Sequence, residues 1–129
     1  SNNWFKYKGC SKLATVTFEK GSQLKTIGGG YSNSSDYYGA FSDCPITSIE
    51  IPASVETIEA AAFKGCLALA KITFEKGINL KKISGGYSEN RNTDGYFYGH
   101  GAFAKCTALT SIEIPASVEN LKRSLDVPL

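Results

Sequence analysis

Four cysteines have the clearest capacity for chemistry in this chain, because a thiol can ligate zinc, form a disulfide or act as a nucleophile. They are Cys10, Cys44, Cys66 and Cys106. A zinc site usually pairs its ligands at Cys-x-x-Cys spacing, which the chain lacks. Each cysteine instead falls three residues after an aromatic residue, which indicates a fixed place in a repeated unit. We therefore predict a ladder of buried thiols without disulfides, and disulfides are the alternative if the chain is secreted.

Catalytic and phosphate-binding motifs have little support in the sequence. The single histidine, His100, lies in a glycine-rich segment with no sign of a paired nucleophile or an orienting carboxylate. The glycines at 28–30 are not followed by the Gly-Lys-Ser or Gly-Lys-Thr of a phosphate-binding loop. The sequence therefore predicts that the protein is not an enzyme, with no catalytic residues, no metal and no cofactor.

The length and the charge of the chain limit the classes of protein to which it can belong. The 129 residues, 42% of them apolar, suit one domain with its own core over 1–129. The 14 basic and 12 acidic residues are scattered and give a net charge of +2, so no basic face predicts nucleic-acid or membrane-surface binding. No apolar stretch reaches the length of a transmembrane helix.

Repetition explains where the cysteines fall. The phrase TSIEIPASVE occurs at 47–56 and again at 110–119, and TFEKG occurs at 17–21 and 73–77. Alignment gives an aromatic-x-x-Cys unit, a Leu-x-x-Ile-x-Ile run and a closing Leu/Val-x-x-Ile. Four copies of this pattern begin at Tyr7, Phe41, Phe63 and Phe103. Without two insertions the period is about 22 to 25 residues, which is typical of a solenoid.

Such a unit cannot bury its own apolar edge, so successive units must stack. Each run alternates at period two near its end, which predicts one short strand per copy, aligned in parallel about 4.8 Å from the next. The strands are expected around Val16, Ile49, Ile72 and Ile112. Pro52 and Pro115 follow directly, where a missing amide hydrogen would end the pairing.

Outward-facing side chains of these strands raise the question of a calcium site. One row contains Thr17, Glu50, Thr73 and Glu113, with Glu19 and Glu75 beside it. Glu50 and Glu113 would lie two strands apart, about 9.6 Å, whereas calcium holds its ligands at about 2.3 to 2.6 Å. The sequence therefore predicts a solvated acidic strip at this row.

The segments AFKGCLALAKITFEKG at 62–77 and AFAKCTALTSIEIPASVENL at 102–121 resemble the BspA-like (Treponema pallidum type) leucine-rich repeat family. The resemblance covers nearly the whole chain outside the insertions. It implies a leucine-rich-repeat solenoid of the α/β class, with short parallel strands, helical or 3-10 turns and about four right-handed turns. It also implies a secreted or cell-surface protein of a host-associated microbe that adheres to a host matrix or cell-surface protein, to other cells or to a glycan.

One departure from leucine-rich repeats in general concerns the turn after the strand. The usual asparagine is replaced by Ser54 and Ser117, or by Gly21 and Gly77. Hydrogen bonds from a side-chain amide are therefore expected to be absent at these turns.

Two insertions, at 28–39 and 84–101, interrupt the copies that contain FEKG, and they hold six of the seven tyrosines. Tyr, Ser, Gly and Asn dominate both, a mixture that paratopes favour because Tyr gives a large amphipathic contact at low entropic cost. The candidate ligand-binding residues are Tyr31, Tyr37, Tyr38, Tyr87, Tyr96, Phe97, Tyr98 and His100. Asp94-Gly95 is typical of a β-hairpin turn and predicts a hairpin in the second insertion, and by analogy one in the first.

Both insertions occur at one point of the repeat, so we expect them to emerge from one flank and form one surface. An adhesion module that binds protein through the solenoid surface and the insertions is the favoured function. The alternatives are a glycan-binding module that uses the tyrosines, and a structural spacer within a longer surface protein. The insertions could also simply cover the solenoid flank or be mobile.

Overall fold

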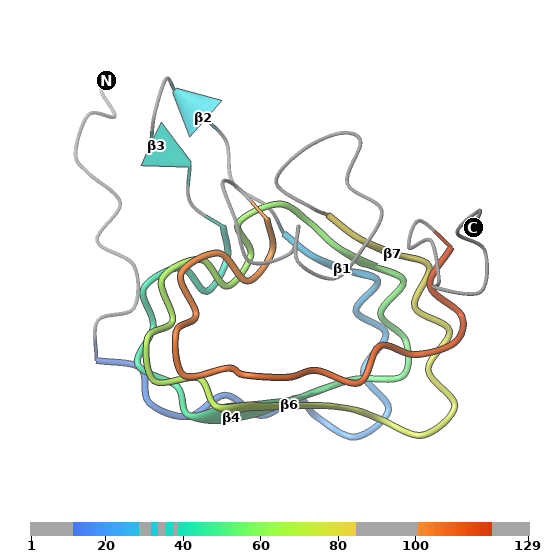
Figure 1. The fold of residues 1–129 in the computed structure, drawn as a ribbon. Helices are drawn as coiled ribbons and strands as arrows, with labels where there is room; N and C mark the ends of the chain where they lie inside the picture. The colour runs from blue at the N-terminus through green and yellow to red at the C-terminus, as the bar shows by residue number, and fades with distance from the viewer. Residues whose placement is uncertain (1–11, 29–31, 34–35, 38, 85–100, 120–129) are drawn as a thin grey trace.

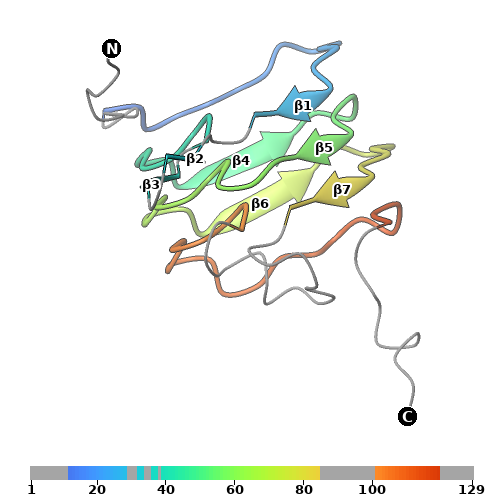
Figure 2. The ribbon, with the colours of Figure 1, turned by 90° about the horizontal axis from the view of Figure 1, so that it is seen from above.

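The computed structural model describes residues 12–28, 32–33, 36–37, 39–84 and 101–119. Across these residues the chain follows a similar closed course in successive passes that lie over one another (Figure 1). We call residues 12–28, 40–59, 60–84 and 101–119 coils 1 to 4. Seen after a turn of 90°, the coils follow one another in chain order (Figure 2). The predicted stacking of repeats is therefore the organising feature of the described chain.

The central pair of strands matches the predicted register. β4 (Ser48–Ile51) and β6 (Lys71–Phe74) pair in parallel, with Ile49 opposite Ile72 and Glu50 opposite Thr73. Ile49 is 4% exposed and Ile72 is 8% exposed, whereas Glu50 and Thr73 face solvent. Alternation at period two thus directs one set of side chains into the core and the other outward, as the sequence predicts.

A second parallel sheet lies across the core from the first. β1 (Thr26–Ile27), β5 (Thr57–Ile58) and β7 (Lys82–Ile83) pair in the order β1-β5-β7 (Figures 1 and 2). Ile27, Ile58 and Ile83 occupy the same register position and are all buried. The closing Ile of each repeat therefore forms a continuous apolar column through three coils.

The strands expected around Val16 and Ile112 are absent, so the prediction is wrong at these two positions. Residues 15–18 and 111–114 carry the same pattern as β4 and β6 but form no ladder with them. Val16 and Ile112 are only partly buried, although both pack against the core. Within the described residues each of these runs has a neighbouring coil on one side only, so it can gain backbone pairing from that side alone.

Serine takes the place of the missing asparagine at the junctions between coils. Ser54 Oγ donates to Leu24 O, and Ser117 Oγ donates to Leu80 O, both at 2.6 Å. The amide hydrogen bonds of an asparagine are absent, but a hydroxyl links each IPASVE turn to the preceding coil. These two contacts are equivalent, which gives a physical reason for the alternation of the two phrases.

The helical or 3-10 turns that the resemblance implies are not found, since none of the described residues lies in a helix. Residues 39–44, 60–66 and 101–106 form hydrogen-bonded turns, which we call the turn side. Phe41 N and Asp43 N donate at 2.8 Å to Ala62 O and Lys64 O of the next coil. The amides that alternate with them bond three residues back within their own turn. Half of the amides are therefore used between coils and are not available to a helix.

Backbone conformation also prevents a helix on the turn side. Asp43, Gly65 and Lys105 precede the cysteines of coils 2, 3 and 4, and their φ angles are 61°, 81° and 63°. A left-handed residue at this point interrupts any right-handed helical turn. Asp43 and Lys105 adopt at this repeat position the conformation that Gly65 adopts without cost, so the packing of neighbouring coils imposes it on them.

A stack of phenylalanine rings fills the core beside these turns. The rings of Phe41 and Phe63 are 5.4 Å apart at 17°, and those of Phe63 and Phe103 are 5.5 Å apart at 20°. Phe63 and Phe103 are fully buried. Aromatic stacking adds to area burial, so the ring column holds coils 2, 3 and 4 together.

The first insertion contains a short antiparallel pair. β2 (Ser32–Asn33) and β3 (Asp36–Tyr37) place Ser32 opposite Tyr37 and Asn33 opposite Asp36. The hairpin that Asp94-Gly95 predicts in the second insertion lies outside the described residues.

Candidate binding surface

The cysteines of coils 2, 3 and 4 carry no disulfide, and those of coils 3 and 4 link neighbouring turns. The thiols of Cys44, Cys66 and Cys106 are buried, as predicted, and Cys10 lies outside the described residues. Cys66 Sγ donates to Phe41 O at 3.0 Å, and Cys106 Sγ donates to Phe63 O at 3.1 Å. Hydrogen bonding with the Cys106 thiol and burial raise the pKa of the Cys66 thiol. Cys66 is thus a neutral thiol, and not the thiolate that nucleophilic or zinc chemistry needs.

The acidic row is a surface strip in which one flanking carboxylate has a structural role. Glu75 Oε1 accepts a hydrogen bond from Ala53 N at 2.6 Å, so this side chain supports the turn after β4. Within the described residues, no group of three or more His, Cys, Asp or Glu side chains could hold a metal ion.

The two insertions close with the same backbone hydrogen bond. This bond runs from the amide before the turn-side Phe to the carbonyl after the closing Ile. It joins Ala40 N to Gly28 O at 3.0 Å, Ala102 N to Ser84 O at 2.9 Å, and Ala62 N to Glu59 O at 3.2 Å. Only Ala60 and Ala61 lie between the bonded residues Glu59 and Ala62. In the other two bonds an insertion lies between the bonded residues. Both insertions therefore begin and end at equivalent points of the fold.

Only one of the predicted ligand-binding residues lies in the described part of the chain. Tyr37 belongs to β3, at the base of the pair that it forms with β2. Tyr31, Tyr38, Tyr87, Tyr96, Phe97, Tyr98 and His100 lie outside the described residues. The structure therefore describes Tyr37 and the points at which the two insertions leave and rejoin the solenoid, whereas the other predicted binding residues fall outside it.

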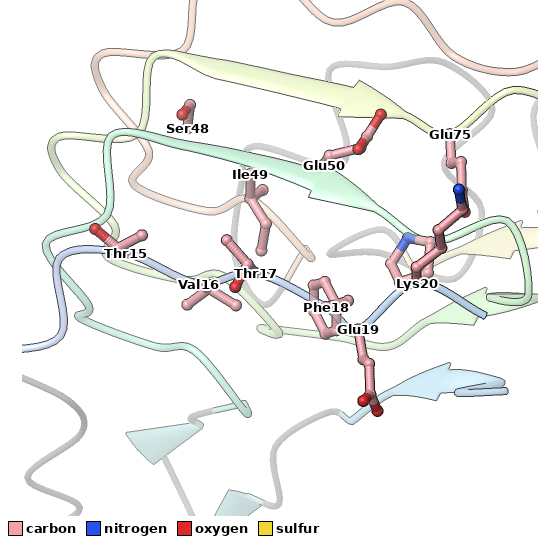
Figure 3. A pocket seen from close by; sticks show the side chains of 11 residues that line it. Thr15, Val16, Thr17, Phe18, Glu19, Lys20, Ser48, Ile49, Glu50 and Glu75 are labelled. Carbon is pink, nitrogen blue, oxygen red and sulfur yellow. The ribbon is translucent and has the colours of Figure 1, made fainter. Parts of the chain in front are cut away.

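A groove that the sequence analysis missed lies between the first coil and β4 (Figure 3). We call it the β4 groove; its volume is about 280 Å³ and its lining is residues 15–20, 48–50, Pro52 and Glu75. Val16, Phe18 and Ile49 supply apolar surface, and Thr15, Thr17 and Ser48 supply hydroxyls (Figure 3). No signal in the sequence marks this groove, because it exists only where residues 15–18 fail to pair with β4.

A second cavity, of about 720 Å³, lies on the other side of the β4–β6 pair. Its lining includes Ile72, Phe74 and Ile78 from coil 3, and Ile114 and Pro115 from coil 4. Each outer edge of the β4–β6 pair therefore faces a cavity. The neighbouring run on each side, 15–18 or 111–114, has the strand pattern but does not pair.

Comparison with known proteins identifies the family. Residues 35–92 and 96–125 match the BspA type leucine rich repeat region, in six copies. The chain belongs to the BspA-type leucine rich repeat family. This match confirms the resemblance inferred from the sequence, although it divides the chain into six copies where our alignment gives four. No curated protein and no solved structure matches the chain.

Family membership supports a general function for the chain. A leucine rich repeat fold implies a solenoid, in agreement with the stacked parallel strands, and it is typically a non-enzymatic protein-binding module. BspA-type proteins are often associated with the cell surface. In the described part of the chain, no helix is long and apolar enough to cross a membrane.

Proposed function

We propose that this chain is a non-enzymatic adhesion module of a secreted or cell-surface protein, and that it binds a host matrix or cell-surface protein. The tyrosine-rich insertions at 28–39 and 84–101 supply the main contacts, together with the adjoining solenoid surface. Membership of the BspA-type family supports protein binding in general.

The observation that carries this proposal is the shared closure of the insertions. Gly28–Ala40 and Ser84–Ala102 occupy equivalent points, with the short Glu59–Ala62 turn between them in the stack. Loops that leave one flank of a rigid scaffold can form a joint binding surface, and their composition can vary without altering the scaffold. Their content of Tyr, Ser, Gly and Asn suits adaptable contacts to a protein surface.

Replacement of Tyr37, Tyr38, Tyr96 and Tyr98 by Ala tests the role of the insertions. We expect binding to arrayed matrix and cell-surface proteins to be lost, because tyrosine is enriched among the few interface residues whose replacement by Ala costs about 2 kcal/mol or more. Thermal unfolding should stay nearly unchanged, since the core rings are elsewhere. Undiminished binding by this variant would overturn the proposal.

A matched control removes the insertions while keeping the coils. Coil 3 shows that two residues are enough to close the turn. Residues 29–38 are therefore replaced by one Ala with Gly39 retained, and residues 85–100 by one Ala with Gly101 retained. This variant should fold and fail to bind. Binding of the unmodified chain to arrayed glycans alone would favour the glycan-binding alternative, and absence of any ligand would favour a spacer.

A further inference from the structure

The β4 groove offers an unpaired strand edge, at a distance in sequence from both insertions. Thr47 O and Ile51 O accept hydrogen bonds from Ala70 N and Glu75 N on the β6 side. Successive residues of a strand direct their amide and carbonyl groups to opposite sides. Ser48 and Glu50 therefore direct theirs away from β6, toward the groove.

Coil 1 does not satisfy this edge. Within the described residues, no backbone hydrogen bond joins 12–20 to β4, although this run has the same pattern of apolar residues. An open strand edge is a template for an additional strand. The groove lies along this edge, with the half-buried Val16 and Phe18 as apolar surface for alternate side chains of an incoming segment (Figure 3).

The charge of the groove lining indicates which kind of peptide segment would bind there. Glu19, Glu50 and Glu75 line the groove, and Lys20 is the only basic residue of the lining. Neither of the ion pairs within the described residues involves these four side chains. Glu50, Glu75 and Lys20 lie at one end of the groove (Figure 3). The lining thus has a net negative charge, which favours a positively charged partner.

We propose that the β4 groove binds an extended basic peptide segment of a partner protein by strand addition to β4. Main-chain hydrogen bonds to Ser48 and Glu50 supply the affinity, and the carboxylates of Glu50 and Glu75 select lysine or arginine in the peptide. This site is independent of the tyrosine-rich insertions, so either proposal can fail while the other stands.

Labelled hexapeptides test the proposal directly. The probe is Lys-Val-Lys-Thr-Lys-Val, and its controls are the peptide with N-methyl groups on alternate residues and the peptide with Glu in place of Lys. In fluorescence anisotropy titrations of the full chain, the N-methyl peptide should bind about tenfold more weakly, which corresponds to the loss of one or two hydrogen bonds. The acidic peptide should bind more weakly still at low ionic strength. No binding of the basic peptide at millimolar concentration, or equal binding of the N-methyl peptide, would overturn the proposal.

Glu50→Gln has a matched control in Glu113→Gln, because Glu113 holds the same repeat position in coil 4. Glu50→Gln should weaken binding of the basic peptide about threefold and reduce its salt dependence, whereas Glu113→Gln should leave both unchanged. Equal effects of the two substitutions would contradict the assignment of the peptide to the β4 groove.

Amide hydrogen exchange distinguishes an open edge from one that coil 1 covers. The amides of Ser48 and Glu50 should exchange rapidly in the unbound chain and become protected when the basic peptide binds. The amides of Ile49 and Ile51, which face β6, should be protected in both states. Protection of Ser48 and Glu50 in the unbound chain would mean that residues 15–18 pair with β4 in solution, and the proposal would fail.

Discussion

On the turn side, coils 2, 3 and 4 are joined by a continuous column of rings from Phe41 through Phe63 to Phe103 and by alternate backbone amides. On the side that carries β4 and β6, which we call the strand side, these two strands form the only pair within the described residues, and the equivalent runs at 15–18 and 111–114 lie beside cavities. The same repeat unit therefore produces close association on one side of the stack and partial association on the other.

Burial of large side chains accounts for the difference. Phe103 is fully buried in coil 4, whereas Ile112 and Ile114 of the same coil are only partly buried. In coil 4 the fully buried ring of Phe103 therefore removes more apolar area from water than either of the half-buried isoleucines does. An outer coil can consequently stay attached through its turn while its strand-forming run remains unpaired.

The largest expected effect comes from the centre of the ring column. Phe63→Ala should lower the free energy of unfolding by about 3 to 5 kcal/mol, because it removes both stacking contacts and leaves a cavity. Phe74→Ala, on the strand side, should cost less because Phe74 is only partly buried. Urea unfolding followed by circular dichroism measures both. A loss from Phe74→Ala equal to that from Phe63→Ala would show that the two sides contribute alike.

A smaller effect is expected from the close approach of backbones on the turn side. A Cβ atom at Gly39 would lie 2.4 Å from Ala62 Cα and 2.5 Å from Ala61 O of the next coil, whereas one at Gly28 would meet no atom within 4 Å. Gly39→Ala should therefore destabilise the chain by about 1 to 3 kcal/mol. Gly28→Ala should be neutral or slightly stabilising, because it restricts the unfolded chain. Equal midpoints of thermal unfolding for the two variants would argue against close contact at Gly39.

The smallest expected effect is a pH dependence of the free energy of unfolding, which arises from Cys66 on the turn side. In the folded chain the pKa of Cys66 is raised above its usual value of 9.0, so the thiol loses its proton first in the unfolded state. Its contribution to stability is complete below that value and is lost as pH rises above it. The free energy of unfolding of the natural chain should therefore fall more steeply between neutral and alkaline pH than that of Cys66→Ala. Parallel profiles would exclude Cys66 as the source.

Much of the strand register could be predicted from the sequence, because the alternation around Ile49 and Ile72 allows only one face to enter the core. The absence of disulfides at Cys44, Cys66 and Cys106 followed from their fixed place in the repeat. Pairing of residues 15–18 and 111–114 was predicted wrongly, because pairing depends on neighbours as well as on pattern. The β4 groove followed from this failure and had no sequence signal of its own.

The sequence by itself determined which coil stacks on which. Lys25 lies within 3.6 Å of Glu56 and Lys81 within 3.7 Å of Glu119, as equivalent ion pairs. Each glutamate ends a TSIEIPASVE segment, and each lysine follows the last residue of a TFEKG segment by four positions. Only the tertiary structure decided which backbone hydrogen bonds form. The amides of the turn side are shared between a coil's own turn and its neighbour, and one edge of β4 is left open. This pattern of backbone hydrogen bonds depends on the polar groups and the apolar surface that adjacent coils present. The sequence of a single repeat does not contain that information.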